Sequence, residues 1–227
     1  MGSSGWSHVT RAVLVCAWLP IGVMLSASAA TAQQPPADPL RHVAGPWDVK
    51  LGLDGAAQVT GQWNSWWNLA ATTAPESGYE ADRSWWEAWL KPSVRITYTA
   101  SDQMTFYGGL AAIASGTAGH DVFLEGDTGR VLLEDAFAGL QWTAAPGVVL
   151  DLSAGQQDYT AGSGMFVHLG GGNGFERGAL LLSPYTAWQM TTIARLKAGS
   201  ISVEGFYPDP NELKPSDSHP RLAGASA

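Results

Sequence analysis

Strict alternation of apolar and polar side chains over residues 84–114 constrains the fold more than any other feature of the chain. A tight polar turn at residues 100–103 divides this stretch into two halves that keep the same parity. The even positions carry the apolar residues Trp86, Ala88, Leu90, Val94, Ile96, Tyr98, Met104, Phe106, Leu110, Ala112 and Ala114. A period of two over roughly ten residues is typical of a β-strand with one apolar face. Residues 84–114 therefore predict a β-hairpin with one apolar and one polar face.

The same alternation recurs along the chain and predicts an all-β, antiparallel fold of about seven strands. The predicted strands are 47–67, 84–99, 104–114, 131–143, 148–154, 185–198 and 201–207. The first of them contains Gly55, which leaves two interpretations open. Residues 47–67 form either one long strand with a kink or bulge at Gly55, or two strands joined there.

The predicted connections alternate in length along the chain. Long loops are expected at 71–83, 115–130 and 156–184, and short turns at 100–103, 144–147 and 199–200. Short turns at one end and long loops at the other are typical of transmembrane β-barrels of the outer-membrane porin type. A break at Gly55 would move every later loop to the opposite side, so the single long strand is preferred.

The N-terminal residues 1–32 have the organisation of a secretory signal peptide. Arg11 precedes an apolar core at 12–25, and the small residues that follow end in an A-x-A site at 30–32. This core is shorter than the roughly 20 residues of a spanning helix, which makes a membrane anchor the weaker alternative. The only cysteine, Cys16, lies inside this signal, so the chain beyond it has no disulfide, thiol chemistry or cysteine-based zinc site.

Three further regions follow the predicted signal. Residues 33–45 are a flexible Pro-containing leader, 46–208 carry the barrel strands, and 209–227 form an irregular tail. Bacterial single-chain barrels have an even number of strands, from 8 upward. About seven strands are too few for closure. The sequence therefore predicts the N-terminal portion of a larger barrel, a partial barrel that is incomplete in this chain.

The composition agrees with strands that face lipid. Charged residues make up 14% of the chain, with 11 Trp and 27 Gly, whereas ordinary globular chains carry about 25% charged residues. Tryptophans at 63–67 and 85–89 flank the predicted loop 71–83, where an interfacial aromatic girdle would lie. The alternative is a tryptophan cluster in a soluble sandwich. The net charge of -8 argues against nucleic acid as a partner.

The segment 155–207 carries a set of short motifs in a defined order. They are Gly155-Gln156-Gln157-Asp158-Tyr159, Gly162-Ser163-Gly164, Gly170-Gly171-Gly172-Asn173-Gly174, Arg177-Gly178-Ala179, Pro184-Tyr185-Thr186-Ala187-Trp188 and Val203-Glu204-Gly205-Phe206-Tyr207. This pattern, with the upstream Asp135-Ala136-Phe137, resembles the alginate-export family of outer-membrane porins.

The resemblance implies a monomeric barrel of about eighteen strands in the cell outer membrane. Such a barrel would export an anionic polysaccharide passively through a lumen lined by basic side chains, with the lipid bilayer as its other partner. This chain departs from the pattern at Tyr185, where an arginine is expected, and its inward faces mix acids with bases. A porin for other small polar solutes, with a neutral lumen, is therefore the alternative within transport.

By parity, several charged side chains face inward and are candidate pore-lining residues. They are Arg95, Lys91, Arg195, Lys197, Glu87 and Glu204, with Arg177 added from a loop that could fold into the pore. Cations there would attract uronate or phosphate groups. The alternative is an ion-pair ladder of these cations with Glu87 and Glu204, and a solvated loop position for Arg177.

No pattern in the sequence predicts an enzyme, a metal site or a cofactor. Asp121, Glu125 and Asp127 lack the spacing of a defined calcium motif. His120 and His168 have no serine on the same strand face, as a Ser–His hydrolase would need. From another class, a soluble periplasmic β-sandwich that binds carbohydrate remains the alternative function.

Overall fold

The computed structural model describes residues 38–63, 82–120, 126–172, 177–214, 217–218, 220 and 222–227. The predicted signal peptide, most of the predicted leader and Trp66 and Trp67 lie outside these residues. Among the described residues, no helix combines the length and the apolar composition needed to cross a bilayer.

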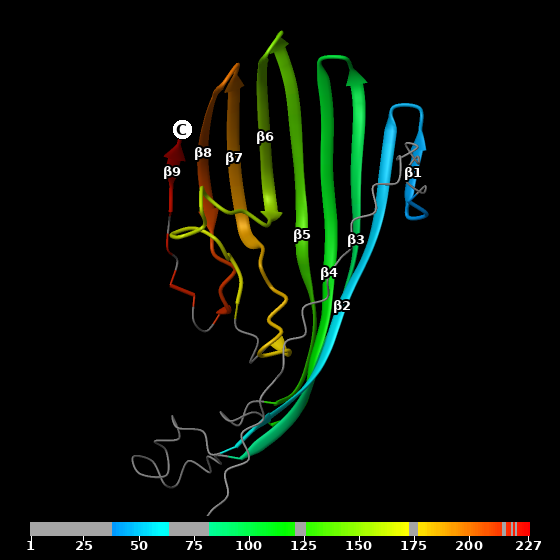
Figure 1. The fold of residues 1–227 in the computed structure, drawn as a ribbon, viewed down its shortest axis with the longest axis vertical. Coiled ribbons are helices and arrows are strands. Elements are labelled where there is room, and N and C mark those ends of the chain that lie inside the picture. The colour runs from blue at the N-terminus through cyan, green and yellow to red at the C-terminus, as the bar shows by residue number, and fades with distance from the viewer. Residues whose placement is uncertain are drawn as a thin grey trace, which may run out of the picture. The chain divides into compact units, whose positions relative to one another are not determined.

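The described chain forms one antiparallel sheet of nine strands in sequence order, and each strand pairs with the next (Figure 1). The strands are β1 Arg41–Ala44, β2 Trp47–Gln62, β3 Arg83–Ser101, β4 Met104–His120, β5 Gly126–Ala145, β6 Val148–Gln157, β7 Trp188–Ala198, β8 Ile201–Asp209 and β9 Gly224–Ser226. The predicted all-β antiparallel architecture is confirmed. The sheet is open, with β1 and β9 at its two edges.

Strands β2–β8 correspond to the seven predicted strands, and β1 and β9 are additional short edge strands. β1 lies within the predicted leader and β9 within the predicted tail, so the sheet extends beyond residues 46–208 at both ends. β2 passes through Gly55 without a register shift, since Gly55 pairs with Leu90 in an unbroken ladder with β3. A single strand is therefore confirmed over 47–62, without the expected bulge at Gly55, and the two-strand alternative is wrong. Residues 64–67 of the predicted strand lie outside the described residues.

The predicted polar loop at 115–130 is largely wrong, because β4 continues to His120 and β5 begins at Gly126. Ser115 and Thr117 are polar, yet both are buried on one face of β4. Their hydroxyl groups bind a segment that folds onto that face. Polar residues that favour a loop in the sequence are thus the inward positions of a strand.

The connections differ in length between the two ends of the sheet (Figure 1). Turns at 45–46, 102–103, 146–147 and 199–200 join strands at one end. The strand ends that flank the longer connections 63–82, 121–125, 158–187 and 210–223 lie toward the other end. Gly45, Gly147 and Gly199 in the short turns have positive φ, a conformation that glycine adopts without a steric penalty.

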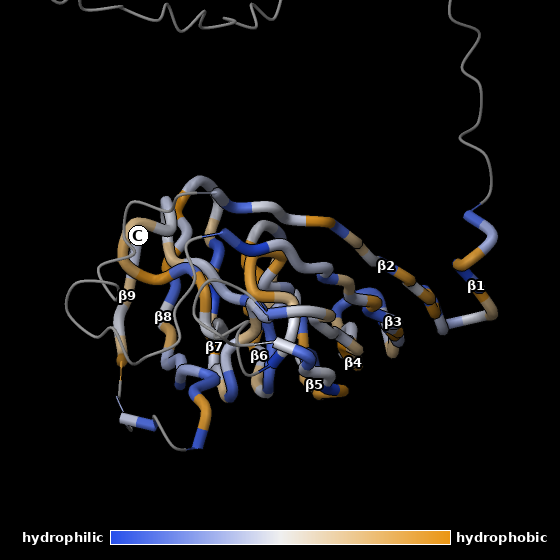
Figure 2. Tube along the Cα trace, turned by 90° about the horizontal axis from the view of Figure 1, so that it is seen from below, coloured by the Kyte–Doolittle hydropathy of each residue, from blue (hydrophilic) through white to orange (hydrophobic). Residues whose placement is uncertain are grey.

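The two faces of the sheet differ in polarity and in exposure. Large apolar side chains remain exposed on one face, which we call the apolar face. It includes the adjacent trio Leu51, Val94 and Leu110, which pair across β2, β3 and β4. The other face, which we call the polar face, buries charged and hydroxyl groups. Figure 2 shows this mixture of polar and apolar residues along every strand, as expected when side chains alternate between faces.

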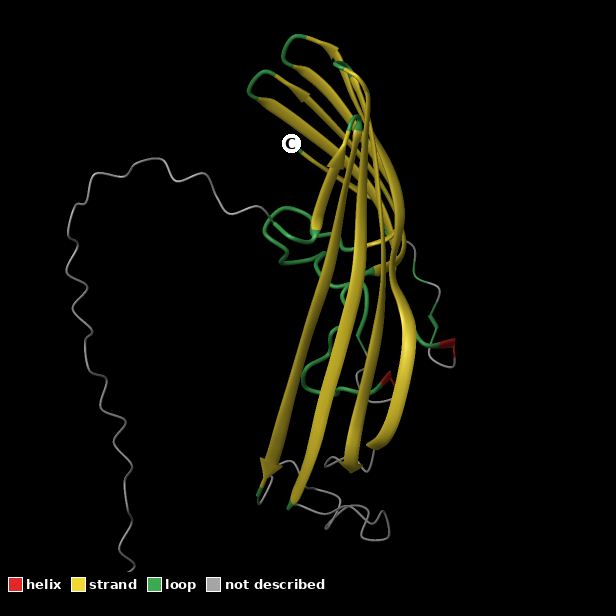
Figure 3. Ribbon diagram, turned by 90° about the vertical axis from the view of Figure 1, so that its right-hand side faces the viewer, coloured by secondary structure: helices red, strands yellow, loops and turns green. Residues whose placement is uncertain are grey.

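Residues 158–187, which we call the covering segment, connect β6 to β7. Their described parts, 158–172 and 177–187, lie against one side of the sheet (Figure 3). Their contacts are with residues of the polar face, as detailed below. A small apolar core anchors the start of this segment: Tyr159, Val167, Trp188 and Ile193 are buried together. The indole Nε1 of Trp188 donates a hydrogen bond to the carbonyl oxygen of Tyr159 at 2.9 Å. The segment is thus packed onto the sheet.

Candidate pore-lining site

The polar face holds the charged residues singled out in the sequence. Glu87, Lys91 and Arg95 lie on β3, Arg195 and Lys197 on β7, Glu204 on β8, and Arg177 in the covering segment. Strand alternation places the six strand residues on one face, as the parity of the sequence predicts. Whether this face lines a pore stays a prediction.

Asp135 on β5 forms ion pairs with two of the candidate pore-lining cations. Its carboxylate is fully buried and accepts a hydrogen bond from Arg95 Nη2 at 2.8 Å, with Lys91 Nζ at 3.5 Å. The Arg95 guanidinium also lies over the Phe137 ring, 4.9 Å from its centroid. Arg95 reaches across β4 to Asp135, because its pairing partner on β4 is Gly109, which has no side chain in the way. The cluster joins β3 to β5 over the intervening strand.

A β-bulge explains why Glu134 also faces inward, which the sequence parity did not predict. The register of β4 with β5 shifts between Ala111 and Ala112, which leaves Glu134 as the extra residue. A bulge re-aims one side chain, so Glu134 and Asp135 point to the same face although they are consecutive. Both are fully buried.

Arg195 and Glu204 form a cross-strand ion pair between β7 and β8. The hydroxyl of Tyr159 donates to Glu204 Oε1 at 2.5 Å and so links the covering segment to this pair. Burial raises the pKa of the Tyr159 hydroxyl, and the hydrogen bond to the Glu204 carboxylate raises this pKa further. The ion-pair alternative is therefore confirmed for Arg195 and Glu204.

Glu87 does not take the role that the ion-pair ladder gave it. Its carboxylate is buried and accepts main-chain N–H groups of Leu181, at 2.9 and 3.1 Å, and of Leu182, at 3.0 Å. The Trp85 indole and the Gln58 amide also donate to it, at 2.6 and 3.2 Å. Among the described residues, Glu87 is thus held by neutral donors of the covering segment and of the sheet, whereas the ion-pair ladder predicted a cation partner.

Glu134 binds the same segment five residues further on. Its Oε1 accepts the main-chain N–H of Thr186 at 2.7 Å and of Ala187 at 2.9 Å. The Thr186 hydroxyl donates to Asp158 Oδ1 at 2.5 Å, which ties the two ends of the covering segment together. Two carboxylates of the sheet, Glu87 and Glu134, therefore bind one stretch of main chain. The sequence carries no local signal for this contact, because the partners are 52 to 95 positions apart.

Arg177 is buried and does not occupy the solvated position that the sequence left open. Its Nη2 donates to the carbonyl and side-chain oxygens of Asn211, at 2.8 and 3.2 Å. Its own carbonyl accepts hydroxyl hydrogen bonds from Ser115 and Tyr185, at 2.7 and 3.1 Å. Arg177 thus fastens the covering segment to β4 and to the chain after β8, and does not project into open space.

Tyr185, at the position where the resemblance implies an arginine, is a buried packing residue. Its hydroxyl bonds Ser115 Oγ, and the Arg177 guanidinium lies 5.4 Å from the ring centroid. Burial raises the pKa of the Tyr185 hydroxyl above its ordinary value. The ring fills space between β4 and the covering segment, so it contributes packing at a place where a cation was expected.

Acids and bases on the polar face differ in exposure. The carboxylates of Glu87, Glu134 and Asp135 are buried, whereas the side chains of Arg95 and Arg195 are 43% and 42% exposed. Lys50, Arg130 and Lys197 are exposed as well. Near the β2 edge the exposed charge of the polar face is less positive, because Asp54 is exposed there as well as Lys50. From β3 to β7, the polar face thus presents mainly positive charge to solvent, although the chain has a net charge of -8.

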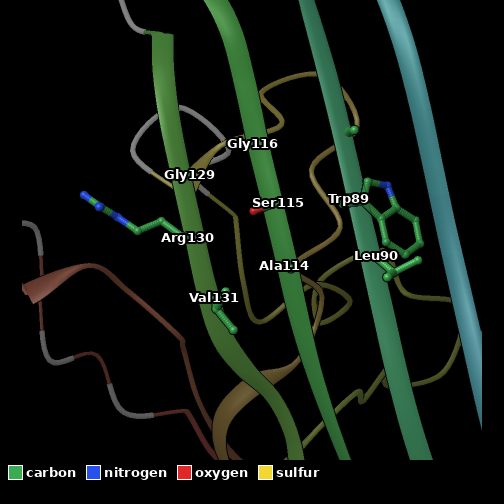
Figure 4. A pocket seen from close by; sticks show the side chains of 9 residues that line it. Trp89, Leu90, Ala114, Ser115, Gly116, Gly129, Arg130 and Val131 are labelled. Carbon is green, nitrogen blue, oxygen red and sulfur yellow. The ribbon is translucent and has the colours of Figure 1, made fainter.

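One depression of about 500 Å³ lies over β3, β4 and β5 (Figure 4). Its lining is mainly small and apolar, with Ala88, Leu90, Ala114 and Val131, and also includes Ser115 and Arg130. Figure 4 shows the Arg130 side chain directed away from Leu90. The depression exists because alanine and glycine leave space between larger neighbours.

The histidines lie outside the polar cluster. His168 Nδ1 shares a hydrogen bond with Thr160 Oγ1 at 3.0 Å, and His120 Nδ1 lies 3.7 Å from Asp127 Oδ2. Asp121 and Glu125 of the calcium hypothesis lie outside the described residues. Within the described ranges, no group of three or more His, Cys, Asp or Glu residues is placed to hold a metal ion.

Comparison with known proteins adds no relative: no protein-family model, curated protein or solved structure matches the chain. The resemblance to the alginate-export family therefore stays a prediction from the sequence.

Proposed function

We propose that the sheet is part of the wall of a transmembrane β-barrel channel in the cell outer membrane. Within this class, the porin of the alginate-export type is the particular function that we favour: passive passage of a polysaccharide or another polar solute. The observation that carries the proposal is the polarity of the two faces. The apolar face remains exposed, while the face that binds the covering segment is charged.

This distribution supports a membrane wall because it is the inverse of a half-solvated soluble sheet. In water, the apolar face of an antiparallel sheet packs on a core and the polar face is solvated. In an outer-membrane barrel, apolar residues face lipid and polar residues face the interior. Exposed Leu51, Val59, Leu110 and Leu133 on the apolar face fit the second arrangement.

The difference in connection length supports the same proposal. Outer-membrane barrels have short turns on the periplasmic side and long loops outside. The turns at 45–46, 102–103, 146–147 and 199–200 would then be periplasmic, and the covering segment would be an outer loop folded into the interior. A loop in that place narrows the passage that the strands surround.

An open sheet needs further strands before it can serve as a barrel wall. Unpaired N–H and C=O groups at a sheet edge are not tolerated in hydrocarbon. β1 pairs only with residues Trp47–Lys50 of β2, so the rest of that edge requires a partner strand. The proposal therefore includes closure by strands other than the nine described here.

The exposed arginines favour an anionic solute over a cationic one. A ring of charge at a constriction selects ions of opposite sign. Arg95 and Arg195 keep part of their side-chain surface open to solvent, while the acids beside them are buried or paired. Uronate or phosphate groups are the chemistry that such guanidinium groups bind well.

Fractionation followed by electrophysiology tests this proposal. We expect the mature protein in the detergent extract of the outer membrane, migrating faster on gels before boiling than after it. In a planar bilayer under a salt gradient, we expect ion conductance and a reversal potential that indicates a preference for anions. Recovery of the protein in the soluble periplasmic fraction, without detergent, would overturn the proposal in favour of a soluble β-sandwich.

A further inference from the structure

Two carboxylates of the polar face, Glu87 and Glu134, make a type of contact that the proposed function does not explain. Each accepts two consecutive main-chain N–H groups of the covering segment: Leu181 and Leu182 for Glu87, Thr186 and Ala187 for Glu134. The two contacts fall on different strands, β3 and β5. They bracket residues 181–187 of the covering segment.

The strand between them completes this arrangement. Thr117 Oγ1 on β4 accepts the main-chain N–H of Ala179 at 2.9 Å, and Ser115 Oγ donates to the Arg177 carbonyl. Three neighbouring strands thus bind one stretch of backbone from residue 177 to residue 187. We call these contacts the seat of the covering segment.

Backbone strain in the segment indicates that the seat holds a conformation that the chain does not adopt easily by itself. Ala179 and Ser183 have positive φ values of 56° and 28°. Non-glycine residues in this region cost free energy and persist where surrounding contacts impose them. Ala179 and Ser183 both lie within the seat.

Charge makes the two carboxylates the strongest contacts of the seat. A hydrogen bond from an N–H group to an ionised carboxylate is roughly twice as strong as one between neutral partners. Both carboxylates are buried, where competing water is excluded and an unmet carboxylate is costly. Release of the segment would leave both acids without these donors, so the seat and the acids stabilise each other.

We propose that Glu87 and Glu134 are positioning residues that set the width of the passage by holding the covering segment through its main chain. This inference rests on the proposed channel function. The wall supplies the acceptors, the segment supplies main-chain donors, and the number of satisfied contacts determines how much of the time the segment is seated.

A spin label on the segment reports its release without any need for conduction. The only cysteine is Cys16, within the predicted signal, so Leu181→Cys introduces a single labelling site in the mature chain. This substitution keeps the N–H donor to Glu87, and the Leu181 side chain is already exposed. The protein is used as the mature chain extracted from the outer membrane and reconstituted in lipid vesicles.

Alanine and glutamine variants of the two acids then test the seat. We expect Glu87→Ala with Glu134→Ala to convert the label from an immobile to a mobile spectrum. Each lost charge-assisted hydrogen bond shifts the seated population by about 10-fold to 100-fold. Glu87→Gln with Glu134→Gln keeps an acceptor oxygen and should give an intermediate spectrum, which covers the case in which the alanine pair does not fold.

Asp151→Asn provides the matched control. Asp151 is also a carboxylate of the polar face, but it accepts its hydrogen bond from Tyr107 of the wall. We expect this variant to keep the immobile spectrum. A mobile label in this control, or an immobile label in both double variants, would overturn the proposal.

Single-channel recording separates the seat from the channel function. In the Glu87→Ala, Glu134→Ala variant, where the label is expected to be mobile, we expect higher conductance and a larger size limit for neutral sugars than in the parent protein. We expect no change in either quantity in the Asp151→Asn variant. Mobility without a change in conductance would overturn the role in setting the width. A parent protein that never conducts refutes the proposed function itself, while the spin-label result still reports on the seat.

Discussion

At the residue scale, glycines on the polar face decide how far long side chains can reach. Arg95 crosses β4 at Gly109 to bind Asp135, and Tyr107 crosses β5 at Gly139 to bind Asp151. A Cβ at Gly109 would lie 2.0 Å from Arg95 Nη1, and one at Gly139 would lie 2.3 Å from the Tyr107 ring. These glycines therefore act by leaving space and not by backbone flexibility.

Gly109→Ala tests this use of space. We expect it to displace the Arg95 guanidinium from Asp135 and to lower the free energy of unfolding by about 1–3 kcal/mol, the cost of a buried group that loses its partner. Urea unfolding in lipid vesicles measures the change. Gly205→Ala is the control, because a Cβ there meets nothing within 4 Å. Equal stability of the two variants would contradict the explanation.

At the element scale, the covering segment is fixed at both of its ends by tyrosine hydroxyls. Tyr159 bonds Glu204 near β8, and Tyr185 bonds Ser115 on β4. The strands beneath follow from the alternation in the sequence, and β2–β8 were predictable for that reason. The seat was not, because Glu87 and Glu134 find their donors far along the chain and because a bulge reverses the parity of Glu134.

Ser115 and Thr117 also could not be assigned from the sequence, because their partners lie far along the chain. Hydroxyl residues on both sides of a glycine, Gly116, favour a loop when only neighbouring residues are considered. Their role as inward positions of β4 depends on Arg177 and Ala179, which are 62 positions later in each case. Alternation predicts which residues share a face, but it does not predict which segment covers that face.

Alkaline pH should loosen the covering segment. The pKa values of Tyr159 and Tyr185 are raised in the folded protein above the unfolded value of about 10. The contribution of these protons to stability is complete below that unfolded pKa and decreases as the pH rises through the folded values. We expect the Leu181→Cys label to become mobile above about pH 10, with a weaker pH dependence in Tyr159→Phe and Tyr185→Phe. An unchanged pH profile in both variants would contradict this assignment.

At the scale of the whole molecule, the distribution of charge fits the two environments that the proposed channel wall would separate. Apolar residues on one face would need no partners in lipid, while the acids Glu87, Glu134 and Asp135 on the other face accept hydrogen bonds from main-chain N–H groups or from an arginine. The antiparallel all-β architecture was predictable from the alternation, whereas the barrel stays a prediction. Closure could not be predicted, since alternation within one strand does not show which strand pairs with the free edge of β2.

A charge on the apolar face distinguishes a lipid environment from a watery one. We expect Leu110→Arg to impair membrane insertion, since arginine on the lipid face of a barrel costs about 2–4 kcal/mol near the bilayer midplane. In water, the same change at this 55% exposed leucine would be close to neutral. The yield of heat-modifiable protein in the outer membrane measures the effect, with Lys197→Glu on the opposite face as the tolerated control. Normal insertion of Leu110→Arg would count against a lipid-facing sheet.

The main-chain contacts of the seat also bear on how this protein can change over generations. Because Glu87 binds the main-chain N–H groups of Leu181 and Leu182, the side chains at these two positions are not what the carboxylate recognises. Almost any residue supplies the required donor, and proline alone lacks it. Natural selection can therefore vary the side chains of this part of the covering segment while Glu87 keeps its backbone in place.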